Sequence, residues 1–150
     1  MMKNQSETRM VLERTFAILK PETVERRLVG ETIKRIEEAG FKILALKLVW
    51  ASREQAERLY EVHFGKPFYH ELIKHITSGP IVPMVLEAEN AVEKLRKLIG
   101  ATDPARAEPG TIRRDLGLSI TKNAIHAADS PESFQREYRI FFSPEEILSY

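Results

Sequence analysis

His126 is the residue of this 150-residue chain best placed to act as a nucleophile. It follows the short apolar stretch at residues 123–125, which predicts a strand, and Ser130-Pro131 soon after it predicts the start of a helix. A histidine at a strand end is well placed to face a cleft. Its ordinary pKa of about 6.5 leaves most of the ring neutral at pH 7, so a ring nitrogen can attack phosphorus without a separate base.

The other three histidines, His63, His70 and His75, fall on predicted helices at or near their surface faces. Solvated or packing roles are more typical of such positions than catalysis. Because the chain has no cysteine, thiolate catalysis, disulfides and thiolate metal sites are excluded.

Transfer of a phosphoryl group relies on positioning and on cationic groups around the phosphates. The candidates are Lys20, which ends the first predicted strand, and Arg96, Arg113 and Arg114, two of which flank a long loop. Each of them, taken singly, is more typical of a solvated surface charge. Phe68 follows a Lys-Pro turn and fits either an exposed stacking platform for a base or a core aromatic.

Common nucleotide and hydrolase motifs are missing from the sequence. It contains no Gly-rich phosphate loop followed by Lys-Ser/Thr, no His-Glu-x-x-His zinc motif and no Gly-x-Ser-x-Gly elbow. Phosphate chemistry in this chain therefore has to use side chains.

Four apolar runs that could position these residues predict strands, at 15–19, 41–50, 81–86 and 123–127. Apolar residues at helical spacing predict helices between the strands, and Ser52 with Gln55 forms a capping box for one of them. Asn90 with Glu93 predicts another helix start. Residues 140–142 are too short a run to classify.

The order of these elements follows a βαββαβ pattern. It predicts an α+β, ferredoxin-like fold, in which a four-stranded antiparallel sheet carries its helices on one face. Residues 101–110 hold two prolines without apolar periodicity and predict a long surface loop.

Composition indicates one globular domain. Hydrophobic residues make up 43% and charged residues 30% of the chain, and the net charge of +1 gives no global nucleic-acid footprint. We expect a polar N-terminal extension at 1–12 and a single domain at 13–150. The N-terminus lacks the apolar stretch of a signal peptide, and the longest apolar run is too short to span a bilayer, so we expect a cytoplasmic protein without a membrane partner.

Several short motifs, in order and spacing, resemble the nucleoside diphosphate kinase family. The resemblance runs from about Glu13 to Tyr150. It is carried by the run from Asn123 to Ser130, which is similar to the family signature Asn-x-x-His-Gly-Ser-Asp-Ser, and by these further segments: Thr15 to Pro21, Lys66-Pro67-Phe68, Ser78-Gly79-Pro80, Gly100-x-Thr102-x-Pro104 and Pro109 to Arg113.

The resemblance implies ping-pong transfer of the terminal phosphate of a nucleoside triphosphate, typically ATP, to a nucleoside diphosphate. The phosphate would pass through phosphohistidine at His126, with Mg²⁺ held mainly by the nucleotide phosphates rather than by a protein site. Lys20 would contact the terminal phosphate and the sugar. Tyr60 would line the site near His126, and Glu137 would orient the histidine ring.

The same resemblance assigns the nucleotide contacts. Stacking of the base would explain acceptance of many nucleotides. The implied roles are phosphate binding by Arg96, Thr102 and Arg113, a ribose contact by Asn123, base stacking by Phe68, and apolar contact by Leu72 and Ile120.

The family fold is ferredoxin-like, and its members assemble as hexamers or tetramers. The C-terminal segment 144–150 resembles the longer tails of hexameric members, so we expect a homohexamer, with a homotetramer as the alternative. In hexamers the loop here at 101–110 helps to form the trimer contact.

The sequence departs from the family signature directly after the histidine. Ala127 and Ala128 stand where glycine and serine are usual, and the family serine supplies a hydroxyl near the carboxylate that Glu137 matches. Its loss predicts a slower or less stable enzyme, by about 1 kcal/mol and more if Glu137 is left unpaired. The same departure motivates an alternative function, a nucleotide-binding or interaction protein with impaired catalysis.

Overall fold

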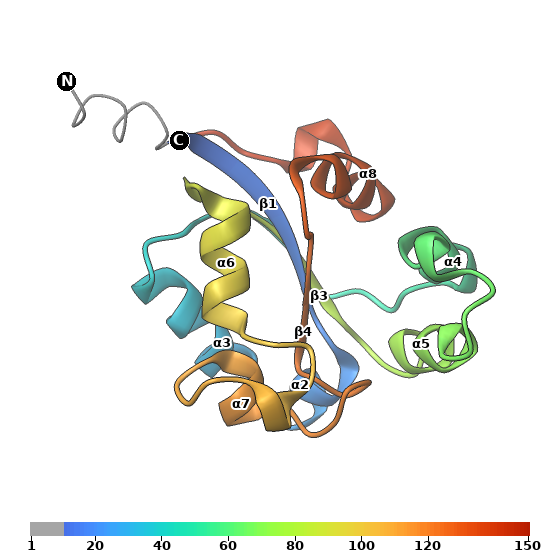
Figure 1. The fold of residues 1–150 in the computed structure, drawn as a ribbon. Helices are drawn as coiled ribbons and strands as arrows, with labels where there is room; N and C mark the ends of the chain where they lie inside the picture. The colour runs from blue at the N-terminus through green and yellow to red at the C-terminus, as the bar shows by residue number, and fades with distance from the viewer. Residues whose placement is uncertain (1–10) are drawn as a thin grey trace.

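The computed structural model describes residues 11–150, which form one four-stranded antiparallel sheet with helices around it (Figure 1). The strand order is β2-β3-β1-β4, so the last strand in the chain lies beside the first. The strands are β1 (Leu12–Leu19), β2 (Lys42–Leu46), β3 (Val82–Glu89) and β4 (Ile125–Ala127). The predicted ferredoxin-like fold class is confirmed.

Helices cover both faces of the sheet, so the expectation of helices on one face is wrong (Figure 1). The reason lies in β1, whose inner residues are buried on both sides. Phe16 and Ile18 pack into one core, while Ala17 and Leu19 pack into the other. One face carries α4 (Arg53–Leu59), α5 (Tyr69–Ile76) and α8 (Pro131–Phe141); the other carries α2 (Pro21–Glu25), α3 (Val29–Glu38), α6 (Ala91–Ile99) and α7 (Ile112–Leu116).

Two short helices, α2 and α7, were not predicted, because five residues are too few to show helical periodicity. Residues 140–142 belong to the last turn of α8 and the residue after it. The predicted second strand is shorter than expected: β2 ends at Leu46, and a single bridge from Val49 to Ile81 follows it. Short 3₁₀ helices complete the chain at Glu61–His63, Pro104–Arg106 and Pro144–Glu146.

Of the two predicted helix caps, the one at α4 forms as expected and the one at α6 does not. Ser52 and Gln55 form the expected reciprocal capping box of α4. Asn90 precedes α6 but has a φ of 51° and does not cap with its side chain. Glu13 on β1 accepts from the Val92 amide at 2.9 Å instead, so a neighbouring strand caps α6.

The predicted extension at 1–12 lies mostly outside the described residues. Of it, only residues 11 and 12 are described, and Leu12 already belongs to β1. None of the helices in residues 11–150 combines the length and the apolar character that crossing a bilayer requires.

Candidate functional site

A cleft of about 480 Å³ lies where β1, β4, α8 and the ends of several helices meet. All eleven residues to which the resemblance assigns a role line it, although they come from distant segments. They are Lys20, Tyr60, Phe68, Leu72, Arg96, Thr102, Arg113, Ile120, Asn123, His126 and Glu137. Their individual roles stay predictions, but the fold brings the whole set to one place. The further candidate Arg114 does not line it and donates instead to the Ala105 and Ala107 carbonyls, both at 3.2 Å.

His126 is the central residue of the three-residue strand β4, inside the predicted strand at 123–127. Its neighbours Ile125 and Ala127 point into the core with α6, so the alternation of a strand turns His126 to the opposite face, toward α8. There its Nε2 lies 2.8 Å from Glu137 Oε1. The Tyr60 ring stands edge-on to the imidazole, with 6.1 Å between ring centroids.

The contact with Glu137 distinguishes the two ring nitrogens of His126. An ionised carboxylate only accepts hydrogen bonds, so Nε2 carries the hydrogen and Nδ1 keeps the lone pair in the neutral ring. Glu137 is 4% exposed, and its second oxygen accepts from Arg136 Nη2 at 3.2 Å. Glu137 is therefore paired at both oxygens even though residue 128 is an alanine.

Lys20 stands between β1 and α2 and reaches into the cleft. Its Nζ donates to the Thr121 carbonyl at 3.1 Å. Burial, and then the positive charge of Arg113, lower the pKa of Lys20 to about 8, while Glu22 acts in the opposite direction. Roughly nine-tenths of Lys20 remains charged at pH 7, so a buried cation faces the cleft.

Arg113 and Asn123 form the polar floor of the cleft. Arg113 donates to the carbonyls of Gly100 at 3.2 Å and Ile125 at 2.8 Å, and burial, followed by the charge of Arg96, lowers its pKa to about 10. Asn123 donates to the Thr102 carbonyl at 3.0 Å. Within residues 11–150, buried Arg113 Nε and Asn123 Oδ1 have no hydrogen-bond partner. A ligand rich in hydroxyls and phosphate oxygens would satisfy both atoms.

The backbone that leads into β4 is strained and firmly held. Ala124 has a φ of 77°, in the left-handed region that favours glycine. Glu22 Oε2 accepts from the Ala124 amide at 2.8 Å, and Thr23 Oγ1 donates to its carbonyl at 2.8 Å. Ala127, by contrast, has no positive φ and sits in β4, so the loss of the family glycine there causes no backbone strain.

Glu22 is itself oriented by His75, whose Nε2 lies 2.6 Å from Glu22 Oε1. Burial alone would raise the pKa of Glu22, but the hydrogen bonds from His75 and the Ala124 amide outweigh it and lower that pKa. His75 therefore pairs with Glu22, a contact that the sequence did not indicate, and it supports the turn before His126 from outside the cleft.

The outer end of the cleft is apolar and open. Phe68 precedes α5 and is 45% exposed, so it is no core aromatic. Leu72 and Ile120 lie near it on the cleft wall. Such a surface suits stacking of a planar base without reading its edges.

His63 is a cleft residue that the sequence interpretation treated as solvated or packing. Its ring lies 5.3 Å from that of Phe68 and 6.2 Å from that of Tyr60. Burial, then the charges of Lys66 and His126, lower the pKa of His63. The available signal was its spacing of three residues from Tyr60, which places the two on one face of a helical turn.

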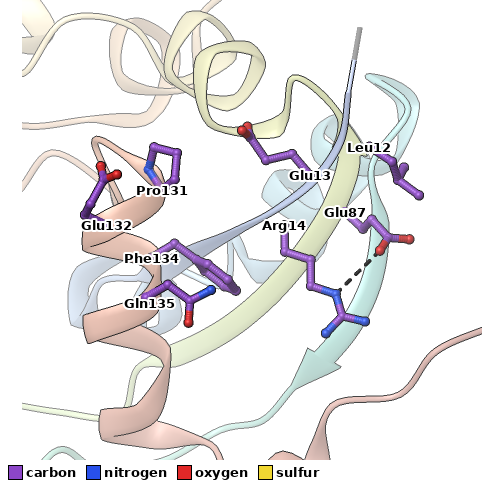
Figure 2. A pocket seen from close by; sticks show the side chains of 8 residues that line it. All are labelled: Leu12, Glu13, Arg14, Glu87, Pro131, Glu132, Phe134 and Gln135. Carbon is purple, nitrogen blue, oxygen red and sulfur yellow. Dashed lines mark hydrogen bonds and ion pairs between the residues drawn. The ribbon is translucent and has the colours of Figure 1, made fainter.

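A second hollow lies between the start of β1 and α8 (Figure 2). Its walls carry Glu13, Glu87 and Glu132, and its one guanidinium, Arg14, is already paired with Glu87 at 3.5 Å. This acidic surface would repel phosphates. The cleft at His126 is instead lined by more basic than acidic side chains. The basic ones are Lys20, Arg96, Arg113 and Arg136, and the acidic ones are Asp129 and Glu137.

Nowhere in residues 11–150 do three or more His, Asp or Glu side chains gather in a group that could hold a metal ion. A divalent ion at the cleft would therefore need most of its ligands from a bound molecule and from water.

Comparisons with known proteins identify relatives of this chain. Residues 13–147 match the sequence model of the nucleoside diphosphate kinase family. The chain is 60% identical to a nucleoside diphosphate kinase of Thermosipho melanesiensis over 93% of this chain and 95% of that protein. It is 55% identical to one of Hyperthermus butylicus, over 93% and 98%.

Two solved structures have similar folds. One is the Aquifex aeolicus nucleoside diphosphate kinase, with a TM-score of 0.89 and 42% identity over 92% of this chain and all of that one. The other is a halophilic nucleoside diphosphate kinase from Halobacterium salinarum in complex with CDP, with a TM-score of 0.89 and 39% identity over 92% of both chains.

Proposed function

Because the chain belongs to the nucleoside diphosphate kinase family, we propose that His126 is the group that carries the phosphate in its reaction. The activity is transfer of the terminal phosphate of a nucleoside triphosphate to a nucleoside diphosphate. The observation that supports His126 most strongly is its hydrogen bond with Glu137, which occupies Nε2 and leaves Nδ1 as the nucleophilic nitrogen.

The reaction divides into two transfers with one covalent intermediate. The Nδ1 lone pair attacks the terminal phosphorus, the bond from phosphorus to the bridging oxygen breaks, and the nucleoside diphosphate leaves with that electron pair. An acceptor diphosphate then binds, and its terminal oxygen attacks the phosphorus and releases His126. Glu137 accepts from Nε2 throughout and stabilises the positive charge that develops on the ring during attack.

The nucleotide would lie along the cleft with its phosphates inward. Lys20, Arg96 and Arg113 supply the cationic charge and Thr102 a hydroxyl, since phosphoryl transfer is mostly positioning and electrostatic stabilisation. Asn123 Oδ1, which is buried and unpaired among the described residues, would accept from a ribose hydroxyl. The base would stack on Phe68, with Leu72 and Ile120 beside it.

We propose Mg²⁺ as the cofactor, held mainly by phosphate oxygens and water. The residues present fit this role: the cleft cations position the phosphates, and magnesium prefers phosphate and water ligands to dedicated protein cages. When bound, the ion neutralises part of the phosphate charge.

Incubation with Mg-ATP followed by intact-mass and peptide analysis tests the proposal. We expect one acid-labile phosphate per chain, located on His126, and its loss on addition of a nucleoside diphosphate. An unmodified His126 in a protein that still binds ADP tightly would contradict the assignment and favour the alternative of impaired catalysis.

The pKa of Lys20 predicts how nucleotide binding depends on pH. A bound phosphate favours charged Lys20 and raises its pKa above the value of about 8 in the free protein. Affinity for ADP should therefore be nearly full at pH 7, about half of that at pH 8, and about tenfold lower at pH 9 than at pH 7. Titration calorimetry at constant ionic strength measures the change.

Lys20→Arg is the matched variant for this measurement, because arginine stays charged throughout the range. Its affinity should stay flat between pH 7 and pH 9, and Lys20→Gln should be weak and equally flat. A wild-type affinity that does not change over this range would argue against phosphate contact by Lys20.

We propose a cytoplasmic homohexamer of a single domain, which begins with β1 at Leu12 and not at residue 13 as expected from the sequence. The C-terminal segment supports this assembly by its likeness to hexameric relatives. Sedimentation velocity separates a hexamer from the alternative tetramer.

A further inference from the structure

Arg136 joins three parts of the cleft wall. It lies on α8 directly before Glu137, and it is one of the residues that line the cleft. One terminal nitrogen, Nη1, donates to the Arg58 carbonyl at 2.9 Å. The other, Nη2, donates to Glu137 Oε2 at 3.2 Å. The rigid fork of the guanidinium therefore fixes Glu137 relative to the end of α4.

The Arg58 carbonyl is a natural acceptor for this contact. It belongs to the last turn of α4, which ends at Leu59, and the final carbonyls of a helix lack partners within the helix. Tyr60 follows directly and stands edge-on to His126. By capping α4, Arg136 also positions the chain that carries Tyr60.

Glu137 needs a second partner because its carboxylate is almost fully buried. Oε1 accepts from His126. Among the described residues, Arg136 is the one hydrogen-bond donor to Oε2. A buried carboxylate with one free oxygen loses much of its stabilisation and can rotate to find another donor.

We propose that Arg136 is a positioning residue for phosphate transfer: it holds the Glu137 carboxylate in the orientation that keeps Nε2 of His126 occupied and Nδ1 free. The inference rests on the proposed roles of His126 and Glu137. In this chain, which has alanine at 128, Arg136 on the cleft wall supplies the second hydrogen bond to the Glu137 carboxylate.

The competing role for Arg136 is direct contact with bound phosphates, since it lines the cleft and is charged. The two roles have different kinetic signatures. A phosphate ligand contributes to ATP affinity, whereas a positioning residue acts on the phosphorylation step at saturating nucleotide.

The test compares Arg136→Ala with the matched control Arg139→Ala. Arg139 lies one turn further along α8, contacts Gln135 at 3.4 Å and the Tyr138 ring, and does not line the cleft. Quench-flow measures His126 phosphorylation against Mg-ATP concentration. We expect Arg136→Ala to slow the saturated phosphorylation rate by about 10- to 100-fold with less than about threefold change in ATP affinity. Arg139→Ala should match the wild type.

A second readout needs no catalysis. Exchange of the His126 ring proton with water, followed by NMR in the nucleotide-free protein, reports the bond from Nε2 to Glu137. It should accelerate by about tenfold in Arg136→Ala. Arg136→Lys, which keeps a donor but not the fork, should be intermediate in both readouts, and it replaces the alanine variant if that variant does not fold.

The outcomes separate the possibilities. Unchanged ring-proton exchange in a folded variant would overturn the positioning role, as would a loss confined to ATP affinity. Failure of the wild-type protein to form phosphohistidine would instead overturn the proposed function, while ring-proton exchange would still decide whether Arg136 orders Glu137 and His126.

Discussion

His126→Gln should lower the steady-state rate of phosphate transfer by about 10⁴-fold or more, because removal of a covalent nucleophile eliminates the two-step route. Glutamine keeps a polar side chain of similar reach, so the core around β4 stays filled. Lys20, Arg113 and Phe68 remain in place, and ADP affinity should change by less than about threefold. A coupled assay measures the rate, and calorimetry measures binding.

His70→Gln is the control for this substitution. His70 is exposed on α5 outside the cleft, so its replacement should leave both rate and affinity at wild-type values. Substantial residual activity of His126→Gln, together with phosphate recovered on another residue, would show that the nucleophile lies elsewhere.

Arg113→Gln should reduce kcat/KM by about 10²- to 10³-fold, the usual effect of removing one charged donor to a transferring group. Its structural effect should be separate. Arg113 donates to the half-buried Gly100 carbonyl and the buried Ile125 carbonyl, so loss of the guanidinium leaves acceptors unpaired and costs about 1–3 kcal/mol of unfolding free energy. Kinetics at 25 °C and thermal unfolding measure the two effects.

Arg53→Gln serves as the comparison for charge alone. Arg53 lies on α4 outside the cleft, has a 69% exposed side chain and makes an ion pair with Glu57 at 3.1 Å. Its loss should change stability by less than about 0.5 kcal/mol and kcat/KM by less than about threefold. If Arg113→Gln behaves in the same way, Arg113 does not hold the phosphates.

Much of the fold was predictable from local pattern. The apolar runs located all four strands, because a strand buried on one or both faces needs consecutive or alternating apolar residues. The Ser52–Gln55 capping box was equally predictable, since both of its hydrogen bonds join residues within a four-residue segment. By contrast, the cap of α6 comes from Glu13, 79 residues before Val92, and no local signal marks it.

At the site, too, some features were predictable from local sequence and others depended on long-range packing. The spacing of the motifs indicated the chemistry and the residue types, and the motifs made His126 the candidate among four histidines. The cleft also contains His63 and Arg136, which those motifs did not mark as site residues. Their place depends on how α4 and α8 pack against β4.

The sequence by itself determined the family and the activity, and it marked the side chains that we propose to bind and transfer phosphate, because these depend on residue type and order. Only the tertiary structure decided which nitrogen of His126 is free and how Glu137 is paired without a serine at 128. It also decided how the strained backbone at Ala124 is held in place, by a hydrogen bond from its amide to Glu22. Each of these contacts joins residues on different elements or fixes a side-chain orientation, and strand register and helix packing set both.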